Sequence, residues 1–356
     1  MIVEDSLIVR GLFTRWLESD GDVRVVKSVP DGAQAVAQLA DCRAEVVILD
    51  IDMPVMDGLE ALPKLLAVNP AVKVVMSSTL TLRNAQISLK ALSLGASDYI
   101  TKPETTRGVT SSETFRHELA EKVKALGAAA RGLKAGALQP AASGALAGRQ
   151  HAPAPRLRMA PIACPLLIAI GCSTGGPQAL VRLLGKLGPN LTVPILITQH
   201  MPAMFTAILA EHLARVTHRP TKEAITGEIP EAGTIYVAPG GHHLLARRQG
   251  GDVILQVDDG PPENFCKPAV DPMFRSLASA YGPDVLAVVL TGMGHDGREG
   301  ARAIVDAGGS IIVQDQPTSV VWGMPGAIAE AGLASAVLPL EEIAPKLIDL
   351  MKGKRA

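Results

Sequence analysis

Short aliphatic runs that alternate with segments of helical periodicity recur along the whole 356-residue chain. The clearest of these runs are residues 45–49, 72–76, 166–170, 193–198 and 284–290. A nearly continuous apolar run fits a strand that is buried on both faces of a parallel sheet, because crossover helices cover both faces of such sheets. The alternation therefore predicts an α/β protein with doubly wound parallel sheets.

The length of the chain and one change in its composition predict two domains. The chain is long enough for two domains of roughly 150 residues each. Residues 129–162 are rich in Ala, Gly and Pro and show no sustained apolar periodicity. We expect a first domain over residues 1–128, a flexible linker over residues 129–162 with His151 in solvent, and a second domain over residues 163–352.

The overall charge and the cysteine content exclude several classes of protein. The net charge of -1 gives no support to binding of nucleic acid or of a membrane surface. No apolar run reaches the roughly 18 residues of a transmembrane helix, so we expect no membrane insertion. The N-terminus does not resemble a signal peptide, and no CxxC pair is present. A reduced, cytoplasmic protein is expected.

Acidic, hydroxyl and basic residues follow the expected strands of the first domain. They are Glu4 and Asp5 after the first strand, Asp50 after the third, Ser78 and Thr79 after the fourth, and Lys102 after the fifth. The carboxyl ends of parallel strands meet at one edge of a sheet, so these side chains are expected to gather there. Three carboxylates at one place repel each other unless a hard cation such as Mg²⁺ lies between them.

These residues, with the sequences ILDIDMPVMDG, MSST and GASDYITKP, resemble the response-regulator receiver domain, which has a flavodoxin-like fold. The resemblance implies that Asp50 accepts a phosphoryl group from a histidine kinase. It implies a Mg²⁺ site made by Glu4, Asp5, Asp50 and the backbone at Asp52. It also implies that Lys102 pairs with the phosphate. Ser78, or the adjacent Ser77 or Thr79, would be the switch hydroxyl that moves towards the phosphate, and Tyr99 would report this movement.

The first strand of this domain is short. Only Met1, Ile2 and Val3 precede the acidic pair, whereas receivers usually carry a fuller strand there. A missing half strand removes central hydrogen bonds and core burial, so we expect it to weaken the domain.

The second domain begins with PLLIAIGCSTGG, which sets Ser173 in a Gly-rich turn between a strand and a helix. Backbone N–H groups and the positive helix terminus face this turn, which suits a nucleophilic serine, a phosphate site or a simple helix cap. The chain lacks GxGxxG spacing here and has no GK[ST], and the next strand ends in His200 instead of an acidic residue. These features disfavour dinucleotide binding.

Ser173, His200 and Asp296 each stand just beyond the carboxyl end of an expected strand. The sheet geometry brings such residues to one rim. A serine nucleophile needs a base, and the base needs a carboxylate that orients it, so the three residues predict a catalytic triad. The order Ser–His–Asp and the absence of GxSxG differ from the α/β-hydrolases. For His242 and His243 we expect a structural or substrate-lining role.

The sequences IGCSTGG, ITQHMP, YVAPGGHH, LTGMGHDG and VWGMPGAI resemble the Rossmann-like catalytic domain of the chemotaxis protein-glutamate methylesterases, which follows a receiver domain. The resemblance implies hydrolysis of glutamate γ-methyl esters on methyl-accepting chemotaxis receptors, deamidation of receptor glutamines, and a chemotaxis histidine kinase as phosphodonor. It implies Ser173 as nucleophile, His200 as general base and acid, and Asp296 as orienting carboxylate, with no cofactor in the esterase site. Backbone N–H groups near Thr174 and Met293 would stabilise the oxyanion.

The domain order also predicts regulation. Before phosphorylation the receiver is expected to cover the triad, and phosphorylation of Asp50 would weaken that contact. Two alternatives stay open from the sequence. One is a signalling module whose second domain only binds partners, and the other is an esterase of small metabolites.

Overall fold

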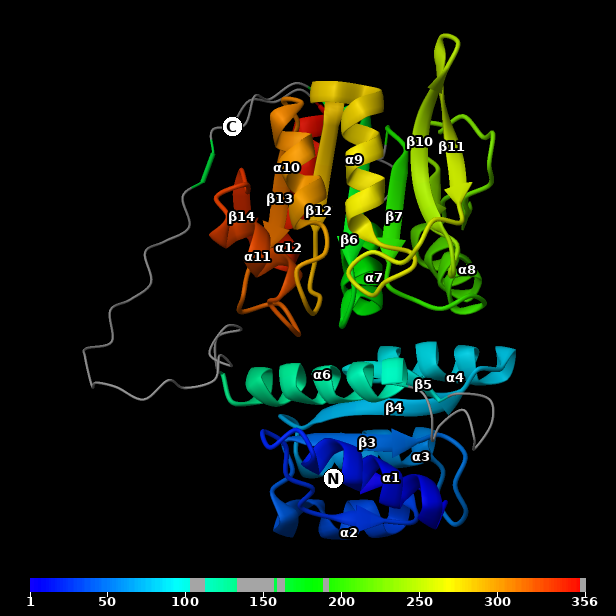
Figure 1. Cartoon of the computed structure of the whole chain (residues 1–356), viewed down its shortest axis with the longest axis vertical. Coiled ribbons are helices and arrows are strands. Elements are labelled where there is room, and N and C mark those ends of the chain that lie inside the picture. Colours follow the sequence, from blue (N-terminus) through cyan, green and yellow to red (C-terminus); the bar gives the residue numbers. More distant parts are fainter. Residues whose placement is uncertain (103–112, 133–156, 159–163, 188–191, 353–356) are drawn as a thin grey trace, which may run out of the picture. The chain divides into compact units, whose positions relative to one another are not determined.

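The protein, seen in a computed structural model, divides into two compact units, Met1–Leu133 and Lys134–Ala356. The structure describes residues 1–102, 113–132, 157–158, 164–187 and 192–352. Each unit contains its own parallel β-sheet (Figure 1). Most of the expected linker, including His151, lies outside the described residues. The prediction of two doubly wound α/β domains is confirmed.

The sheet of the first unit has the order β2-β1-β3-β4-β5 with all strands parallel, as in flavodoxin-like folds. Its strands are β1 (Ile2–Val3), β2 (Ser28–Val29), β3 (Val46–Asp50), β4 (Lys73–Thr79) and β5 (Asp98–Lys102). Its helices are α1 (Leu7–Glu18), α2 (Gly32–Cys42), α3 (Gly58–Val68), α4 (Leu82–Ser93) and α6 (Glu113–Ala130). Helices α1 and α6 meet through the rings of Phe13, Trp16 and Phe115.

Four helices of this unit begin at a side chain that caps them. The capping residues are Ser6 at α1, Asp31 at α2, Asp57 at α3 and Thr81 at α4. In each case a side-chain oxygen accepts a hydrogen bond from the N–H three residues later, which satisfies a donor that the helix leaves unpaired. Local sequence thus determines where each strand-to-helix turn ends.

The first two strands are shorter than the other three. The second strand, β2, contains only Ser28 and Val29. The reason is that β2 pairs with β1, and β1 offers only Ile2 and Val3 as partners. Strand β1 also pairs with β3, so β1 lies inside the sheet although it has only two residues.

The second unit is a seven-stranded parallel sheet of order β14-β13-β12-β6-β7-β9-β8, which is Rossmann-like. Its strands are β6 (Leu167–Cys172), β7 (Ile195–Gln199), β8 (Thr221–Glu223), β9 (Ile235–Val237), β12 (Val285–Val289), β13 (Ser310–Gln314) and β14 (Ala336–Leu338). From β6 the sheet continues through β7, β9 and β8 on one side and through β12, β13 and β14 on the other, so the strand order changes direction between β6 and β12. Ligands of such sheets bind at this switch point, beyond the carboxyl ends of the strands.

The helices of this unit are α7 (Gly176–Leu187), α8 (Phe205–Thr217), α9 (Val270–Tyr281), α10 (Arg298–Asp306), α11 (Met324–Glu330) and α12 (Leu340–Met351). A separate hairpin joins β10 (His243–Gln249) to β11 (Asp252–Asp258), beside α9 in Figure 1. Strands β8 and β14 are three residues long and pair on one side only, so they lack the apolar run of a central strand.

The core of the second unit is mainly aliphatic, with Tyr236 and Phe274 among its few buried rings. None of the helices in the described residues has both the length and the apolar character that crossing a bilayer requires.

Candidate active site

Ser173 lies in the turn between β6 and α7. Its carbonyl oxygen accepts a 2.7 Å hydrogen bond from Gly176 N, which closes the turn. Gly175 has φ +78°, and a Cβ there would lie 2.6 Å from Val320 Cγ2. A glycine is therefore needed at this position for both its backbone conformation and its lack of a side chain. The turn leaves Ser173 half-buried beyond the end of β6.

His200 follows the neighbouring strand. Cys172 and Gln199 are paired across β6 and β7, and Ser173 and His200 are the next residue of each strand. His200 N donates a 3.1 Å hydrogen bond to Cys172 O. Gln199 Nε2 lies 3.1 Å from Ser173 O and 3.1 Å from His200 O, so one buried amide joins the two turns. The sheet register thus brings the predicted nucleophile and base to the same edge.

Asp296 contacts the His200 ring. His200 Nε2 lies 2.7 Å from Asp296 Oδ2. The carboxylate also accepts hydrogen bonds from the backbone N–H groups of Val270, Asp271 and Gly297. Burial alone would raise the pKa of Asp296, but His200 and these N–H groups outweigh burial and hold the pKa well below its usual range. Asp296 is therefore a fixed anion against the imidazole.

The segment after β12 brings a glycine against Ser173. A Cβ at Gly292 would lie 3.0 Å from Ser173 Cβ. Met293, one of the two predicted oxyanion positions, is the next residue. Thr174, the other, is buried, and its carbonyl oxygen accepts a 2.9 Å hydrogen bond from Thr291 Oγ1. Both predicted positions therefore belong to the two segments that meet at Ser173, and their role stays a prediction.

The two adjacent histidines of the hairpin differ in environment. His243 is buried, and its ring accepts from Ala269 N at 3.1 Å and lies 2.9 Å from Pro261 O. It therefore braces both ends of the loop between β11 and α9. His242 is half-exposed, with Nδ1 3.6 Å from Asp259 Oδ1. For His243, these hydrogen bonds support a structural role, one of the two roles that we expected.

The first unit gathers its acidic residues as a metal site requires. One carboxylate oxygen from each of Glu4, Asp5 and Asp50 lies within 4.8 Å of the others. Lys102 Nζ lies 2.7 Å from Asp50 Oδ1 and 3.1 Å from Glu4 Oε2. Burial raises the pKa of Asp50 to about 6, because Lys102 offsets only part of that effect and Glu4 adds to it. Three oxygen donors beside a buried cationic group fit a hard divalent cation and a phosphoryl group.

The remaining receiver residues lie around this cluster. Asp52 is exposed, and its Oδ2 accepts a 3.3 Å hydrogen bond from Asn84. The hydroxyl of Ser78 lies 3.3 Å from that of Ser88 on α4, on the face of β4 opposite to Asp50. Ser77, by contrast, is the register partner of Asp50, and its buried Oγ has no hydrogen-bond partner among the described residues.

Tyr99 is buried on β5, and burial raises the pKa of its hydroxyl well above the usual value. Lys122 of α6 donates a 2.6 Å hydrogen bond to the Tyr99 carbonyl and lies 5.3 Å from the ring centre. Tyr99 is thus linked to α6 through both its backbone and its ring.

The comparisons with known proteins agree with this geometry. Residues 168–347 match the family model described as CheB methylesterase, and residues 1–112 match the response regulator receiver domain. The chain belongs to the CheB methylesterase family. It therefore combines a methylesterase/glutaminase domain with a receiver domain, as the sequence motifs predicted.

Individual relatives support this assignment. A protein-glutamate methylesterase/protein-glutamine glutaminase of Rhodopseudomonas palustris is 50% identical over 100% of this chain and 94% of its own length. The enzyme of the same name from Azospirillum brasilense is 53% identical over 97% of this chain and 90% of its own. The crystal structure of the Thermotoga maritima CheB methylesterase catalytic domain is 40% identical, covers 53% of this chain and 100% of its own, and has a TM-score of 0.51.

In this methylesterase, two side chains outside the predicted triad touch the His–Asp pair. Cys266 Sγ lies 3.3 Å from His200 Nδ1. Asn264 Nδ2 donates to Asp296 Oδ1 at 2.9 Å and to Asp271 Oδ2 at 3.0 Å. No motif marks these residues, because they lie in an irregular loop about 65 residues after His200. Their contacts arise only from the path of that loop.

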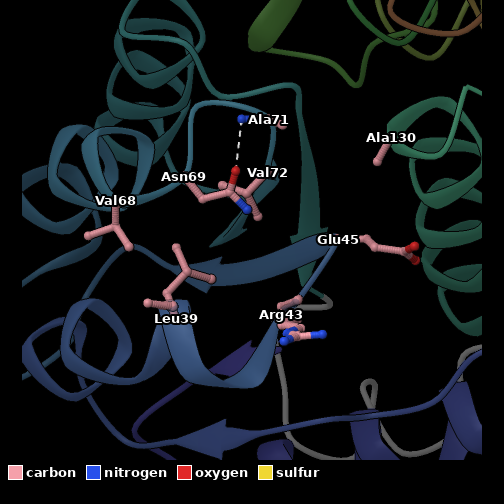
Figure 2. Close-up of a pocket in the computed structure, with 10 residues that line it drawn as sticks. Leu39, Arg43, Glu45, Val68, Asn69, Ala71, Val72 and Ala130 are labelled. Atoms are coloured by element: carbon pink, nitrogen blue, oxygen red, sulfur yellow. Dashed lines mark hydrogen bonds between the residues drawn. The ribbon is translucent and has the colours of Figure 1, made fainter.

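A pocket of the receiver lies away from the acidic cluster (Figure 2). Glu45 and Val72 line it, and they directly precede β3 and β4, whereas Asp50 ends β3. Within the pocket Asn69 Oδ1 accepts a 3.0 Å hydrogen bond from Ala71 N, which the dashed line in Figure 2 marks. The pocket is therefore at the amino-terminal edge of the sheet, opposite to the candidate phosphorylation site.

Proposed function

We propose that this chain removes methyl groups from glutamate γ-methyl esters of methyl-accepting chemotaxis receptors, deamidates receptor glutamines, and is activated by phosphorylation of Asp50. The observation that carries the proposal is the 2.7 Å contact between His200 and a buried Asp296 carboxylate, at the strand end next to Ser173. The domains that we propose are residues 1–128 and 163–352, and the site of action is the cytoplasm, where a chemotaxis histidine kinase supplies the phosphoryl group.

Ser173 is the proposed nucleophile. Because His200 Nε2 is engaged by Asp296, Nδ1 is the ring nitrogen that takes the Ser173 hydroxyl proton. Ser173 Oγ then bonds to the γ-carbonyl carbon of the substrate. When the tetrahedral intermediate collapses, the C–O bond to the methoxy group breaks and His200 gives its proton to the departing methoxy oxygen, so that methanol leaves. With a glutamine substrate the C–N bond breaks instead and ammonia leaves.

Water completes the cycle. His200 takes a proton from a water molecule, the hydroxide attacks the acyl-serine, and the Ser173 oxygen leaves with the proton from His200. Throughout, Asp296 keeps the ring orientation and stabilises the imidazolium. Backbone N–H groups at Thr174 and Met293 are the proposed donors to the oxyanion. These steps use side chains, backbone and water alone.

Asp50 is the proposed phosphoryl acceptor of the receiver. Glu4, Asp5 and Asp50, with the backbone at Asp52, would hold Mg²⁺, which offsets negative charge on the transferred group when bound. The ammonium group of Lys102 would pair with the phosphoryl oxygens, and Tyr99 would report the phosphorylation of Asp50.

For the switch hydroxyl we favour Ser77 over Ser78. The Ser77 side chain shares a face of the sheet with Asp50, and its hydroxyl is buried without a partner among the described residues. Ser78, on the other face, is engaged with Ser88.

The test is methanol release from methylated receptor membranes by the full chain, with and without a small-molecule phosphodonor and Mg²⁺. We expect Ser173→Ala to lower the rate by about 10⁴-fold or more, and Asp50→Ala to abolish only the response to the phosphodonor. Absence of methanol release by the parent would favour a binding module. Turnover of free methyl esters as fast as that of receptor membranes would favour a metabolite esterase.

A further inference from the structure

A four-residue turn, residues 263–266, reaches both members of the His–Asp pair. Glu263 and Cys266 exchange two backbone hydrogen bonds, of 3.1 and 2.8 Å. The two central residues, Asn264 and Phe265, have φ of +51° and +62°, as a type I′ turn requires. Left-handed backbone at two non-glycine residues costs free energy, and such costs concentrate at functional sites.

The turn directs its side chains in different directions. Asn264 faces inward, where its amide donates to Asp296 and to the second buried carboxylate, Asp271. Cys266 also faces inward, with its sulfur at Nδ1 of His200. Phe265, between them, is 87% exposed. One turn thus contacts the Asp296 carboxylate at the oxygen that His200 does not touch, and the imidazole at the nitrogen that Asp296 does not touch.

The surroundings hold this turn in place. Arg275 of α9 forms a 2.5 Å ion pair with Glu263. His243 bonds the loop before the turn at Pro261 and after it at Ala269. The turn is therefore anchored on both sides by groups that do not touch the His–Asp pair.

We propose that residues 263–266 position the proposed triad, with Asn264 holding Asp296 and Cys266 holding His200 at the nitrogen that receives the Ser173 proton. The inference rests on the proposed function for its catalytic meaning. Asn264 and Cys266 are positioning residues, since they act through Asp296 and His200. The contact of Cys266 also occupies Nδ1 in the resting protein, so Ser173 must displace the sulfur from Nδ1 when it gives up its proton.

This arrangement predicts a measurable change in His200. Burial lowers the pKa of His200, but the Cys266 sulfur and the Asp296 carboxylate outweigh burial and raise it. Among the described residues these two are the ionisable groups in contact with the ring. The Asp271 carboxylate is joined to Asp296 through the Asn264 amide. Lys267, in the same loop, donates a hydrogen bond to Asp259. Removing the sulfur must therefore lower the pKa of His200.

The experiment is an NMR titration of the His200 ring in the full chain, together with methanol release from methylated receptor membranes over pH. Cys266→Ala is expected to lower the His200 midpoint, and the acid limb of kcat/KM, by about one pH unit, a tenfold change in the ionisation constant. Glycine tolerates the positive φ of position 264, so Asn264→Gly keeps the turn. This variant is expected to raise the His200 midpoint and the acid limb of kcat/KM, because Asp296 loses a donor and pairs more strongly with His200. The same variant is expected to lower kcat with little change in KM.

The matched control is Cys164→Ala. Cys164 is an exposed thiol that bonds to Met351 O instead, so neither measurement should move. If the His200 midpoint and acid limb stay unchanged in both turn variants, the positioning role is wrong even though the parent releases methanol. If the midpoints move as expected but the parent releases no methanol, the turn positions the His–Asp pair and the proposed activity is wrong.

Discussion

At the residue scale, the receiver site depends on one buried ammonium group. Lys102 lies between Asp50 and Glu4, and its side chain is 11% exposed. We predict that Lys102→Met lowers the free energy of unfolding of this unit by about 3 kcal/mol at pH 8, since two buried carboxylates lose their partner. The loss should be smaller at pH 5. Lys102 lowers the pKa of Asp50, so without Lys102 this pKa lies above about 6 and the carboxyl is neutral at pH 5.

Hydrogen exchange of the β3 and β4 amides in the full chain measures this effect. Lys64→Met is the matched control, because Lys64 pairs with Glu60 on the surface of α3, where both side chains are about half exposed. Such a pair contributes no more than about 0.5 kcal/mol. Equal losses for the two variants would contradict the assigned role of Lys102.

At the element scale, the turn between β6 and α7 fixes the position of Ser173. We predict that Gly175→Ala destabilises the second unit and abolishes ester hydrolysis, because its φ is positive and its Cβ would meet Val320. Gly227→Ala is the control, since Gly227 also has a positive φ (+93°) but no heavy atom within 4 Å of the added Cβ. Gly227→Ala should cost only the backbone term, about 1–2 kcal/mol.

Thermal unfolding and methanol release of both variants check this prediction. Gly175→Ala should lose at least about 1 kcal/mol more than Gly227→Ala, because overpacking adds to the backbone cost. A Gly175→Ala protein as active as Gly227→Ala would show that the turn can relax without moving Ser173.

At the scale of the whole molecule, each of the two units has its own parallel sheet. The proposed regulation must therefore pass from one unit to the other as a change in populations. We predict that a chain starting near residue 160 hydrolyses receptor methyl esters at a rate that does not depend on phosphodonor and Mg²⁺. The full chain should become faster when phosphodonor and Mg²⁺ are added. Without them, the full chain should be slower than the truncated chain. Equal rates under all conditions would argue against control by the receiver.

The sequence by itself determined the elements whose causes are local. Continuous apolar runs made the central parallel strands recognisable, and side chains such as Asp31 and Asp57 cap the helices they precede. Since parallel strands present their carboxyl ends at one edge, the expectation that His200 and Asp296 share a rim needed only the order of the elements. The same reasoning placed Glu4 beside Asp50.

Only the tertiary structure decided what depends on register and on irregular backbone. The length of β2 follows from its two-residue partner, and the face that carries Ser77 follows from its pairing with Asp50. The contacts of Asn264 and Cys266 follow from a loop whose path no periodicity encodes. Local sequence sets the preference of each segment, but a contact between distant side chains exists only once the whole sheet and its loops are in place.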